Sequence, residues 1–185
     1  MDLNKIVKMF EEIDMPQKQQ VSFTPYTQQF KIELGPAKRA EQWVKRTLEE
    51  DFGTVLEADD KEIHYDLLIR KTGKKVEVKY DKGSKGSGKL AIELESYGKY
   101  KGILRSKSDF YAIVCYDHDW AEIVEGVKRK GSWICIVINT SYLREMVKQK
   151  PYKEIFGGDN KKTKIALVPT EDVREASVKI YPITK

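Results

Sequence analysis

The chain has few of the side chains that build zinc sites and disulfide frameworks, with only two cysteines and two histidines in 185 residues. This argues against a structural zinc site, which typically takes four such ligands. It also argues against a small secreted domain held together by disulfides. Cys115 and Cys135 each lie inside an apolar run, FYAIVCY and SWICIVI. We therefore interpret both as buried structural thiols rather than as a redox pair or metal ligands.

Long apolar segments are also lacking. No stretch approaches the roughly 20 apolar residues that a membrane-spanning helix requires. The first residues, MDLNKIVKMFEEID, carry acidic side chains where a signal peptide would have its apolar run. We therefore expect no membrane partner and a cytoplasmic protein. The hydrophobic share of 40% and the charged share of 34% are typical of a globular domain, and this length can bury a core without disulfides.

Positive charge is in excess and unevenly distributed. The net charge of +5 is a weak indication of a polyanionic partner. Between Ile69 and Leu90, however, eight basic residues face only two acidic ones, which gives +6 in 22 residues. A solvated basic loop would explain this run without any function. The motif embedded in it favours contact with phosphate instead.

Hydrophobic periodicity predicts one α/β domain with a central mixed sheet flanked by helices. Its core would span about residues 37–140, with an N-terminal helical extension, 1–36, and a C-terminal α/β elaboration, 141–185. Before the centre, the pattern predicts a helix at 3–13, a strand at 30–34 and a helix at 37–51 that stops at Gly53. The centre reads as strands 63–70 and 75–80 joined by a turn at 71–74, then a flexible loop at 81–88 and a strand at 89–95.

The second half of the chain begins with two apolar runs, Phe110–Cys115 and Ser132–Ile138. Both are typical of strands that are covered on both faces. The sequence YDHDW between them predicts a turn, so we favour a turn over a metal site for Asp117-His118-Asp119. The remaining predicted elements are a helix at 141–148, a lysine-rich loop, a strand at 165–168, a helical turn after Thr170 and an alternating segment at 178–180.

A group of charged residues in the centre could carry chemistry. The two-residue period of a strand places Glu77 and Lys79 on one face, and Asp66 lies eleven residues earlier in the adjacent strand. Clustered carboxylates of this kind hold Mg²⁺ or Mn²⁺ and promote phosphodiester hydrolysis. An isolated E-x-K triplet is usually a pair of solvent-facing charges on an amphipathic hairpin. Here the preceding helix with Glu41 and the following basic, glycine-rich segment favour a site.

The pattern D-x(10)-E-x-K after a helix bearing a glutamate resembles the PD-(D/E)xK superfamily. This superfamily includes restriction endonucleases, archaeal Holliday-junction resolvases and many phage nucleases. The longer block KGSGKLAIELESYGKYKGILRSKSDFYAIV is similar to phage-type nucleases that read I-E-x-E-S, then G-K-x-S-G-I, then S/T-K-A-D-Y-Y. The matching region runs from about Ala37 to Cys115.

The resemblance implies a restriction-endonuclease-like core and a Mg²⁺- or Mn²⁺-dependent nuclease. Asp66 and Glu77 would bridge the metal, Lys79 would orient the attacking water, the Val78 carbonyl would complete the metal shell, and Glu41 would be a further metal ligand. Two departures are visible in the sequence. Tyr65 replaces the proline before the aspartate, and Lys101-Gly102-Ile103 lacks the small hydroxyl residue that relatives often have before the glycine.

Further residues are weaker candidates. Glu93 shares a strand face with Glu95, and two readings stay open for it: a residue in or beside the active site, or an ordinary strand residue. The predicted DNA contacts are Lys82, Lys85, Lys89, Ser106 and Lys107. We expect a DNA-cleaving enzyme that could be encoded by a phage and act inside the host cell. Two alternatives stay open: a Holliday-junction resolvase that acts on branched DNA as a homodimer, and a non-cleaving DNA-binding protein on the same fold.

Overall fold

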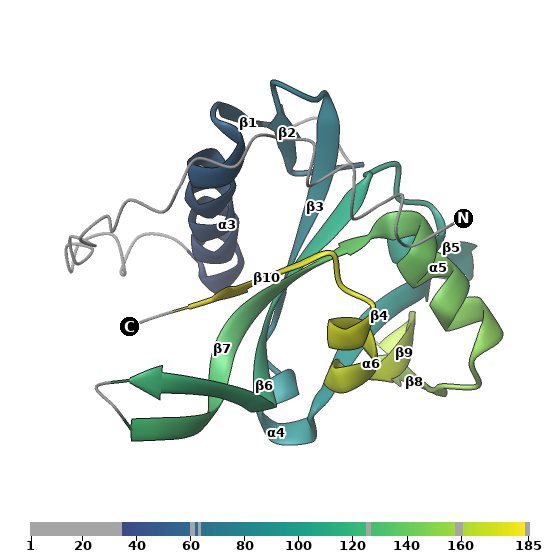
Figure 1. Cartoon of the computed structure of the whole chain (residues 1–185). Coiled ribbons are helices and arrows are strands. Elements are labelled where there is room, and N and C mark those ends of the chain that lie inside the picture. Colours follow the sequence, from purple (N-terminus) through teal and green to yellow (C-terminus); the bar gives the residue numbers. More distant parts are fainter. Residues whose placement is uncertain (1–34, 60–61, 63, 125–126, 158–160, 184–185) are drawn as a thin grey trace.

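A computed structural model describes residues 35–59, 62, 64–124, 127–157 and 161–183 (Figure 1). The helix predicted at 3–13, the strand predicted at 30–34 and almost all of the N-terminal extension lie outside the described residues. Within the described part, no helix is long and apolar enough to cross a membrane.

The larger sheet has six strands in the order β1-β2-β3-β6-β7-β10. Neighbouring strands pair antiparallel, except that β3 and β6 are parallel. The predicted mixed sheet is thereby confirmed. Its strands are β1 (Val55–Glu57), β2 (Leu67–Ile69), β3 (Lys74–Asp81), β6 (Phe110–Val124), β7 (Val127–Asn139) and β10 (Lys179–Pro182).

A second, antiparallel sheet has four strands in the order β5-β4-β9-β8. The strand predicted at 89–95 is present as β4, but it belongs to this second sheet, so the expectation of one central sheet is wrong in this respect. Between β3 and β4 a short helix, α4 (Ser84–Ser87), ends at the left-handed Gly88 and redirects the chain. The strands are β4 (Lys89–Ser96), β5 (Lys99–Tyr100), β8 (Lys153–Gly157) and β9 (Thr163–Pro169).

Helix α3 (Pro36–Phe52) covers one face of the six-stranded sheet (Figure 1). Its buried stripe is Ala40, Val44, Leu48 and Phe52, which pack against residues such as Val76 and Val78 of β3. The helix ends where Gly53 adopts a φ of 77°, a left-handed conformation that glycine adopts at little cost. The helix predicted at 37–51 is therefore confirmed.

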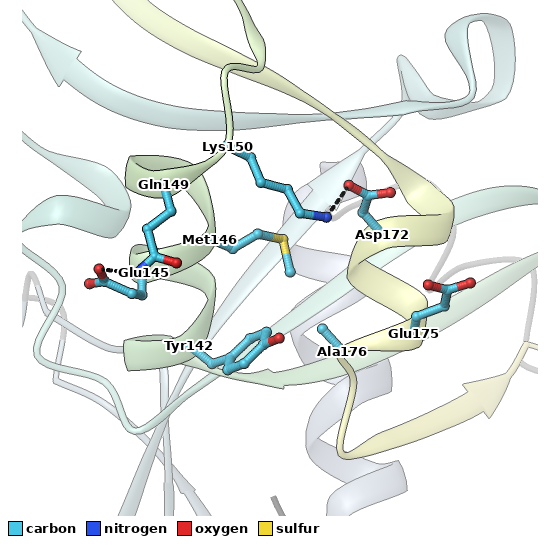
Figure 2. Close-up of a pocket in the computed structure, with 8 residues that line it drawn as sticks. All are labelled: Tyr142, Glu145, Met146, Gln149, Lys150, Asp172, Glu175 and Ala176. Carbon is cyan, nitrogen blue, oxygen red and sulfur yellow. Dashed lines mark hydrogen bonds and ion pairs between the residues drawn. The ribbon is translucent and has the colours of Figure 1, made fainter. Parts of the chain in front are cut away.

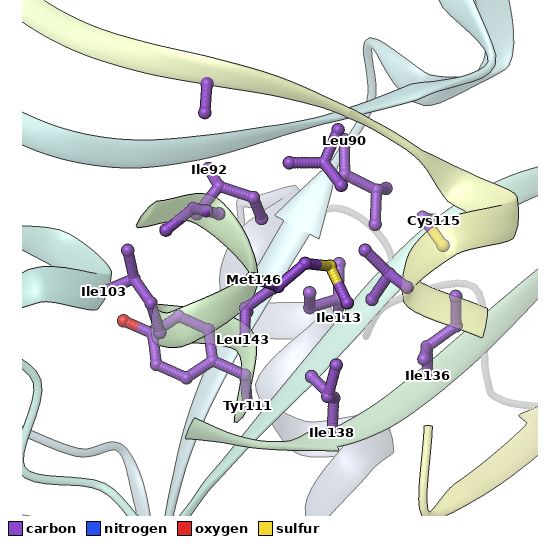
Figure 3. Close-up of a cluster of buried hydrophobic side chains, with 14 of the residues drawn as sticks. Leu90, Ile92, Ile103, Tyr111, Ile113, Cys115, Ile136, Ile138, Leu143 and Met146 are labelled. Carbon is purple, nitrogen blue, oxygen red and sulfur yellow. The ribbon is translucent and has the colours of Figure 1, made fainter. Parts of the chain in front are cut away.

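The other face of the six-stranded sheet packs against the second sheet and two helices, α5 (Thr140–Gln149) and α6 (Thr170–Glu175) (Figure 3). Side chains of β6 and β7 meet side chains of β4, β9 and α5 in this core, including Ile113, Ile136, Leu90, Val168 and Leu143. The described chain is therefore a mixed α/β structure with helices on both sides of a central sheet, as predicted. Cys115 and Cys135 are both buried and free.

The turn predicted at YDHDW is wrong, because β6 continues to Val124 and pairs with β7 along the way. The register shifts between Asp117 and Ala121, which is the irregularity that YDHDW encodes. The buried Asp117 side chain accepts hydrogen bonds from the Asp119 and Trp120 amides, and it forms a 2.8 Å ion pair with Arg174. Asp117 therefore has a structural role in the strand pair.

The segment predicted as a flexible loop, 81–88, is held in place by hydrogen bonds. Asp81 accepts from the Ser84 amide at 3.0 Å and from the Ala91 amide at 2.6 Å. The buried Ser84 hydroxyl donates to the Asp81 carbonyl and accepts from the Tyr116 amide at 2.8 Å. Similarly, the predicted lysine-rich loop contains β8. The elements predicted at 141–148, 165–168, after Thr170 and at 178–180 correspond to α5, β9, α6 and β10.

Candidate active site

The β2–β3 hairpin places Asp66 beside Glu77. Leu67 pairs with Val76 in the antiparallel register, and the Asp66 amide donates to the Val76 carbonyl at 2.9 Å. The next position in this register sets Asp66 opposite Glu77, as predicted. One detail of the prediction is wrong, since β2 begins at Leu67 and Asp66 directly precedes the strand.

The Asp66 carboxylate lies at an open edge of β3. Its Oδ2 accepts a 2.6 Å hydrogen bond from the Val78 amide. The amide and carbonyl of one strand residue point to the same edge, so the Val78 carbonyl also lies on the Asp66 side. Since β2 pairs only as far as Val76, no described strand covers this edge beyond that residue. Asp66 and the Val78 carbonyl are therefore oxygen donors at one edge, as the prediction required.

Glu77 and Lys79 project from the face of β3 that is opposite α3. Lys79 Nζ lies 2.5 Å from Glu77 Oε1. The Glu77 side chain is 16% exposed and that of Lys79 is 48% exposed, so the pair opens to solvent through the lysine. Burial opposes the charge on Lys79, but Glu77, with smaller contributions from Asp66 and Glu93, outweighs it and raises the lysine pKa. Lys79 is therefore a cation at neutral pH.

The surroundings of Asp66 disfavour its negative charge. Burial raises its pKa from the ordinary 3.8 to about 6. The Val78 amide and Lys79 act in the opposite direction, while the charges of Glu77 and Glu41 add to the rise. A nearby cation would therefore stabilise the charged form of this half-buried carboxylate.

Glu41 reaches the site from α3. Its Oε2 lies 2.7 Å from Lys38 Nζ on the same helix. Its charge still contributes to the raised pKa of Asp66. The role of Glu41 as a further metal ligand stays a prediction.

Glu93 reaches the site from β4, in the second sheet. It is half-buried, and its charge acts on both Lys79 and Tyr111. Gly102, with a φ of 52°, packs directly against it, since a Cβ at this position would lie 2.4 Å from the Glu93 carbonyl oxygen. Only a glycine lets the chain approach β4 so closely. The charge of Glu93 thus acts on Lys79, while its place in the active site stays a prediction.

The loop before β6 holds the predicted phosphate contacts Ser106 and Lys107. The Ser106 hydroxyl lies 2.8 Å from that of Ser108, which lies 3.0 Å from that of the buried Thr140. Arg144 Nη2 donates to the Ser106 carbonyl at 2.7 Å. These bonds give Ser106 a structural role in fixing the loop, whereas Lys107 is exposed. Their contact with DNA stays a prediction.

The predicted basic surface surrounds α4, at the end of β3 beyond Lys79. Its lysines are exposed, and none forms an ion pair with a described residue. Lys85 Nζ lies 5.6 Å from the centre of the Tyr116 ring. This surface, Lys82, Lys85 and Lys89, is therefore available to an anionic partner.

Tyr111 is a residue of the site that sequence reasoning missed. It pairs with Glu77 in the parallel β3–β6 register and is only 3% exposed. Burial raises the pKa of its phenol above the usual range, and the charge of Glu77 raises it further. The nearby Ser106 hydroxyl lowers this pKa, although no hydrogen bond of normal geometry joins the two hydroxyl groups. We predicted Phe110–Cys115 as an apolar strand. The hydroxyl inside this apolar run was the signal that could have identified Tyr111.

A hollow of about 380 Å³ lies elsewhere, between α5 and α6 (Figure 2). It contains none of the predicted site residues. Its lining has three carboxylates and one lysine, so its excess of negative charge does not suit a polyanion. The lining residues are Tyr142, Glu145, Met146, Gln149, Lys150, Asp172, Glu175 and Ala176.

The donor set at the β3 edge suits a hard divalent cation. It consists of two carboxylates and a backbone carbonyl, the oxygen ligands that Mg²⁺ and Mn²⁺ prefer, and Mg²⁺ ordinarily retains several waters. Across the described ranges, no group of three or more histidine, cysteine, aspartate or glutamate side chains is arranged to hold a metal ion. A cation at Asp66 and Glu77 would therefore rely on the Val78 carbonyl and water, and Glu77 would have to turn from Lys79.

No protein-family model, curated protein or solved structure matches the chain.

Proposed function

We propose that this protein is a divalent-metal-dependent deoxyribonuclease with a PD-(D/E)xK active site on a restriction-endonuclease-like core. One observation carries the proposal: Asp66 lies opposite Glu77 in the β2–β3 register, Glu77 is ion-paired with Lys79, and no described strand covers this edge of β3 beyond Val76. The order of elements supports it too, since α3 precedes the β2–β3 hairpin, and β3 pairs parallel with β6.

Asp66, Glu77 and the Val78 carbonyl would hold Mg²⁺ or Mn²⁺, with Glu41 as a peripheral ligand through water. The bound cation would polarise the scissile phosphate and lower the pKa of an attacking water. The raised pKa of Asp66 supports this placement, because a cation would relieve the unfavourable charge. The protein residues supply the geometry: the Val78 amide fixes the Asp66 carboxylate, and the β3 backbone fixes Glu77 next to it.

Lys79 would act on the reacting groups themselves. Its ammonium lies 2.5 Å from Glu77 Oε1. When Glu77 turns towards a cation, this ammonium becomes available, 48% exposed, beside the reaction centre. There it would orient the attacking water and stabilise the negative charge that develops on the phosphate.

DNA would contact the basic surface around α4. Lys82, Lys85 and Lys89 are exposed and lie three or more residues along the chain from Lys79. Neutralising phosphates with such side chains releases counterions and makes binding depend on salt. This surface would serve a non-cleaving DNA-binding protein equally well, and only the Asp66–Glu77–Lys79 arrangement favours cleavage.

The test is cleavage by the purified full chain with Mg²⁺ or Mn²⁺ on linear, circular, single-stranded and branched DNA. We expect cutting that stops with excess chelator and in Asp66→Asn. Glu154→Gln is a matched control, because Glu154 is a carboxylate paired with Lys164 on the second sheet, and it should cut like the parent.

The same assay separates the alternatives. Cutting restricted to branched DNA by a dimeric protein would indicate a Holliday-junction resolvase. DNA binding without cutting under every metal condition would indicate the non-cleaving protein. Full cutting in excess chelator would refute the metal-dependent mechanism.

A further inference from the structure

The hydroxyl of Tyr111 is buried without a hydrogen-bond partner among the described residues. Figure 3 shows its ring at the edge of the core cluster, with the hydroxyl directed towards Ile103 and away from the centre of the cluster. The ring packs within the core between the two sheets. The hydroxyl therefore lies at the margin of this core rather than at its centre.

An unpaired buried hydroxyl is unfavourable. Leaving such a group without a partner destabilises the fold, and phenylalanine would fill the same space without that cost. No hydrogen bond of normal geometry to a described residue offsets this cost, so packing alone does not account for a tyrosine here. A second state of the site, in which the hydroxyl has a partner, would account for it.

The best candidate for the hydrogen-bond partner of the Tyr111 hydroxyl lies on the neighbouring strand, β3. Glu77 pairs with Tyr111 in the β3–β6 register, and its charge is the largest electrostatic influence on the phenol. Glu77 forms an ion pair with Lys79 at 2.5 Å. The Ser106 hydroxyl is already within hydrogen-bond distance of Ser108. Glu77 is thus the group near Tyr111 that must change partners when a cation binds.

We propose that Tyr111 is a positioning residue for Glu77. When Glu77 leaves Lys79 to bind a divalent cation, the Tyr111 hydroxyl donates a hydrogen bond to its carboxylate and holds it in the ligating orientation. The inference rests on the proposed metal site. Outer hydrogen bonds of this kind typically change metal affinity by about 10- to 100-fold.

The test compares Tyr111→Phe with the parent chain in two measurements. Mn²⁺ affinity, measured by isothermal titration calorimetry without DNA, should fall by about 10- to 100-fold in the variant. The thermal midpoint in excess chelator should stay equal or rise, since the variant removes an unpaired buried group. In a Glu77→Gln background, Tyr111→Phe should cause little further loss of affinity.

Tyr152→Phe is the matched control. The Tyr152 hydroxyl donates to Asp172 at 2.6 Å, so it is already paired in the metal-free protein. Its removal should lower the thermal midpoint and leave Mn²⁺ affinity unchanged. This is the opposite pattern from the one expected for Tyr111.

Three results would count against the inference. Parental Mn²⁺ affinity in Tyr111→Phe, with the parent cutting DNA, overturns the inference and leaves the proposed function intact. A Tyr111→Phe chain that is less stable than the parent, or that fails to fold, shows a structural hydroxyl and also overturns it. If the parent binds Mn²⁺ no better than Asp66→Asn does, the proposed function and the inference fall together.

Discussion

Replacing Asp66 by asparagine should make the metal-free protein more stable at about pH 8. The structure raises the pKa of this carboxyl from 3.8 to about 6, chiefly through burial. A pKa raised by folding means that the protonated form stabilises the fold. That contribution is fully present below about pH 4 and is lost as the pH rises through about 6.

The size of the effect follows from the two pKa values. Their difference corresponds to about 3 kcal/mol of stability lost by the parent at about pH 8. Asparagine is uncharged at every pH and avoids this loss. It also accepts a weaker hydrogen bond from the Val78 amide than a carboxylate does. We therefore expect a net gain of about 1–3 kcal/mol.

Urea denaturation followed by circular dichroism, in excess chelator at about pH 8 and about pH 4, measures the effect. The variant should be the more stable protein at the higher pH and close to the parent at the lower one. Added Mn²⁺ should stabilise the parent at about pH 8 and have little effect on the variant. A variant that is less stable at about pH 8, or a difference that is the same at both pH values, would refute the reasoning.

Asp109→Asn provides a control of opposite sign. Burial opposes the charge on Asp109, but the Lys75 amide and the Lys74 ammonium outweigh it and lower the pKa of this carboxyl. A carboxyl whose pKa is lowered by folding stabilises the fold at every pH above the pKa that it has in the unfolded chain. This stabilisation is lost as the pH falls through its pKa in the folded protein. Asp109→Asn should therefore destabilise the protein at about pH 8.

Three further predictions follow from the structure. Lys79→Ala should slow cleavage about 100-fold or more and should also lower stability, because it leaves the largely buried Glu77 carboxylate without its ion-pair partner. Lys79→Arg should restore little of the activity, and parental turnover in the folded, metal-bound alanine variant would remove Lys79 from the site. Gly102→Ala should lower the free energy of unfolding by more than about 1 kcal/mol in thermal melts, because the new Cβ would clash with Glu93 and the φ is positive; unchanged stability would contradict the close approach. Replacing Lys82, Lys85 and Lys89 of the basic surface around α4 by alanine should weaken DNA binding and reduce the slope of log affinity against log salt by up to about 3. The charge-matched control replaces Lys153, Lys161 and Lys162 by alanine. An unchanged slope in the first variant would mean that these lysines are only a solvated surface.

Local periodicity determined the elements that carry the site. The spacing of apolar residues and the stop at Gly53 were enough to predict α3, since a helix repeats every 3.6 residues and glycine adopts the left-handed cap conformation. The two-residue period of a strand placed Glu77 and Lys79 on one face. The tight turn at 71–74 was enough to bring Asp66 opposite them. Each of these depends on residues that are close in the chain, so the sequence contains the necessary information.

Long-range packing decided the rest. The alternation of β4 predicts a strand but not its partner, and only the fold shows that it pairs with β9, in a second sheet that brings Glu93 to the site. Likewise, YDHDW has the composition of a turn, yet pairing with β7 keeps it extended. Tyr111 reads as one more residue of an apolar strand. Its place beside Glu77 comes from the parallel pairing of β3 with β6, which joins segments more than 30 residues apart, and local sequence has no period that specifies such a pairing.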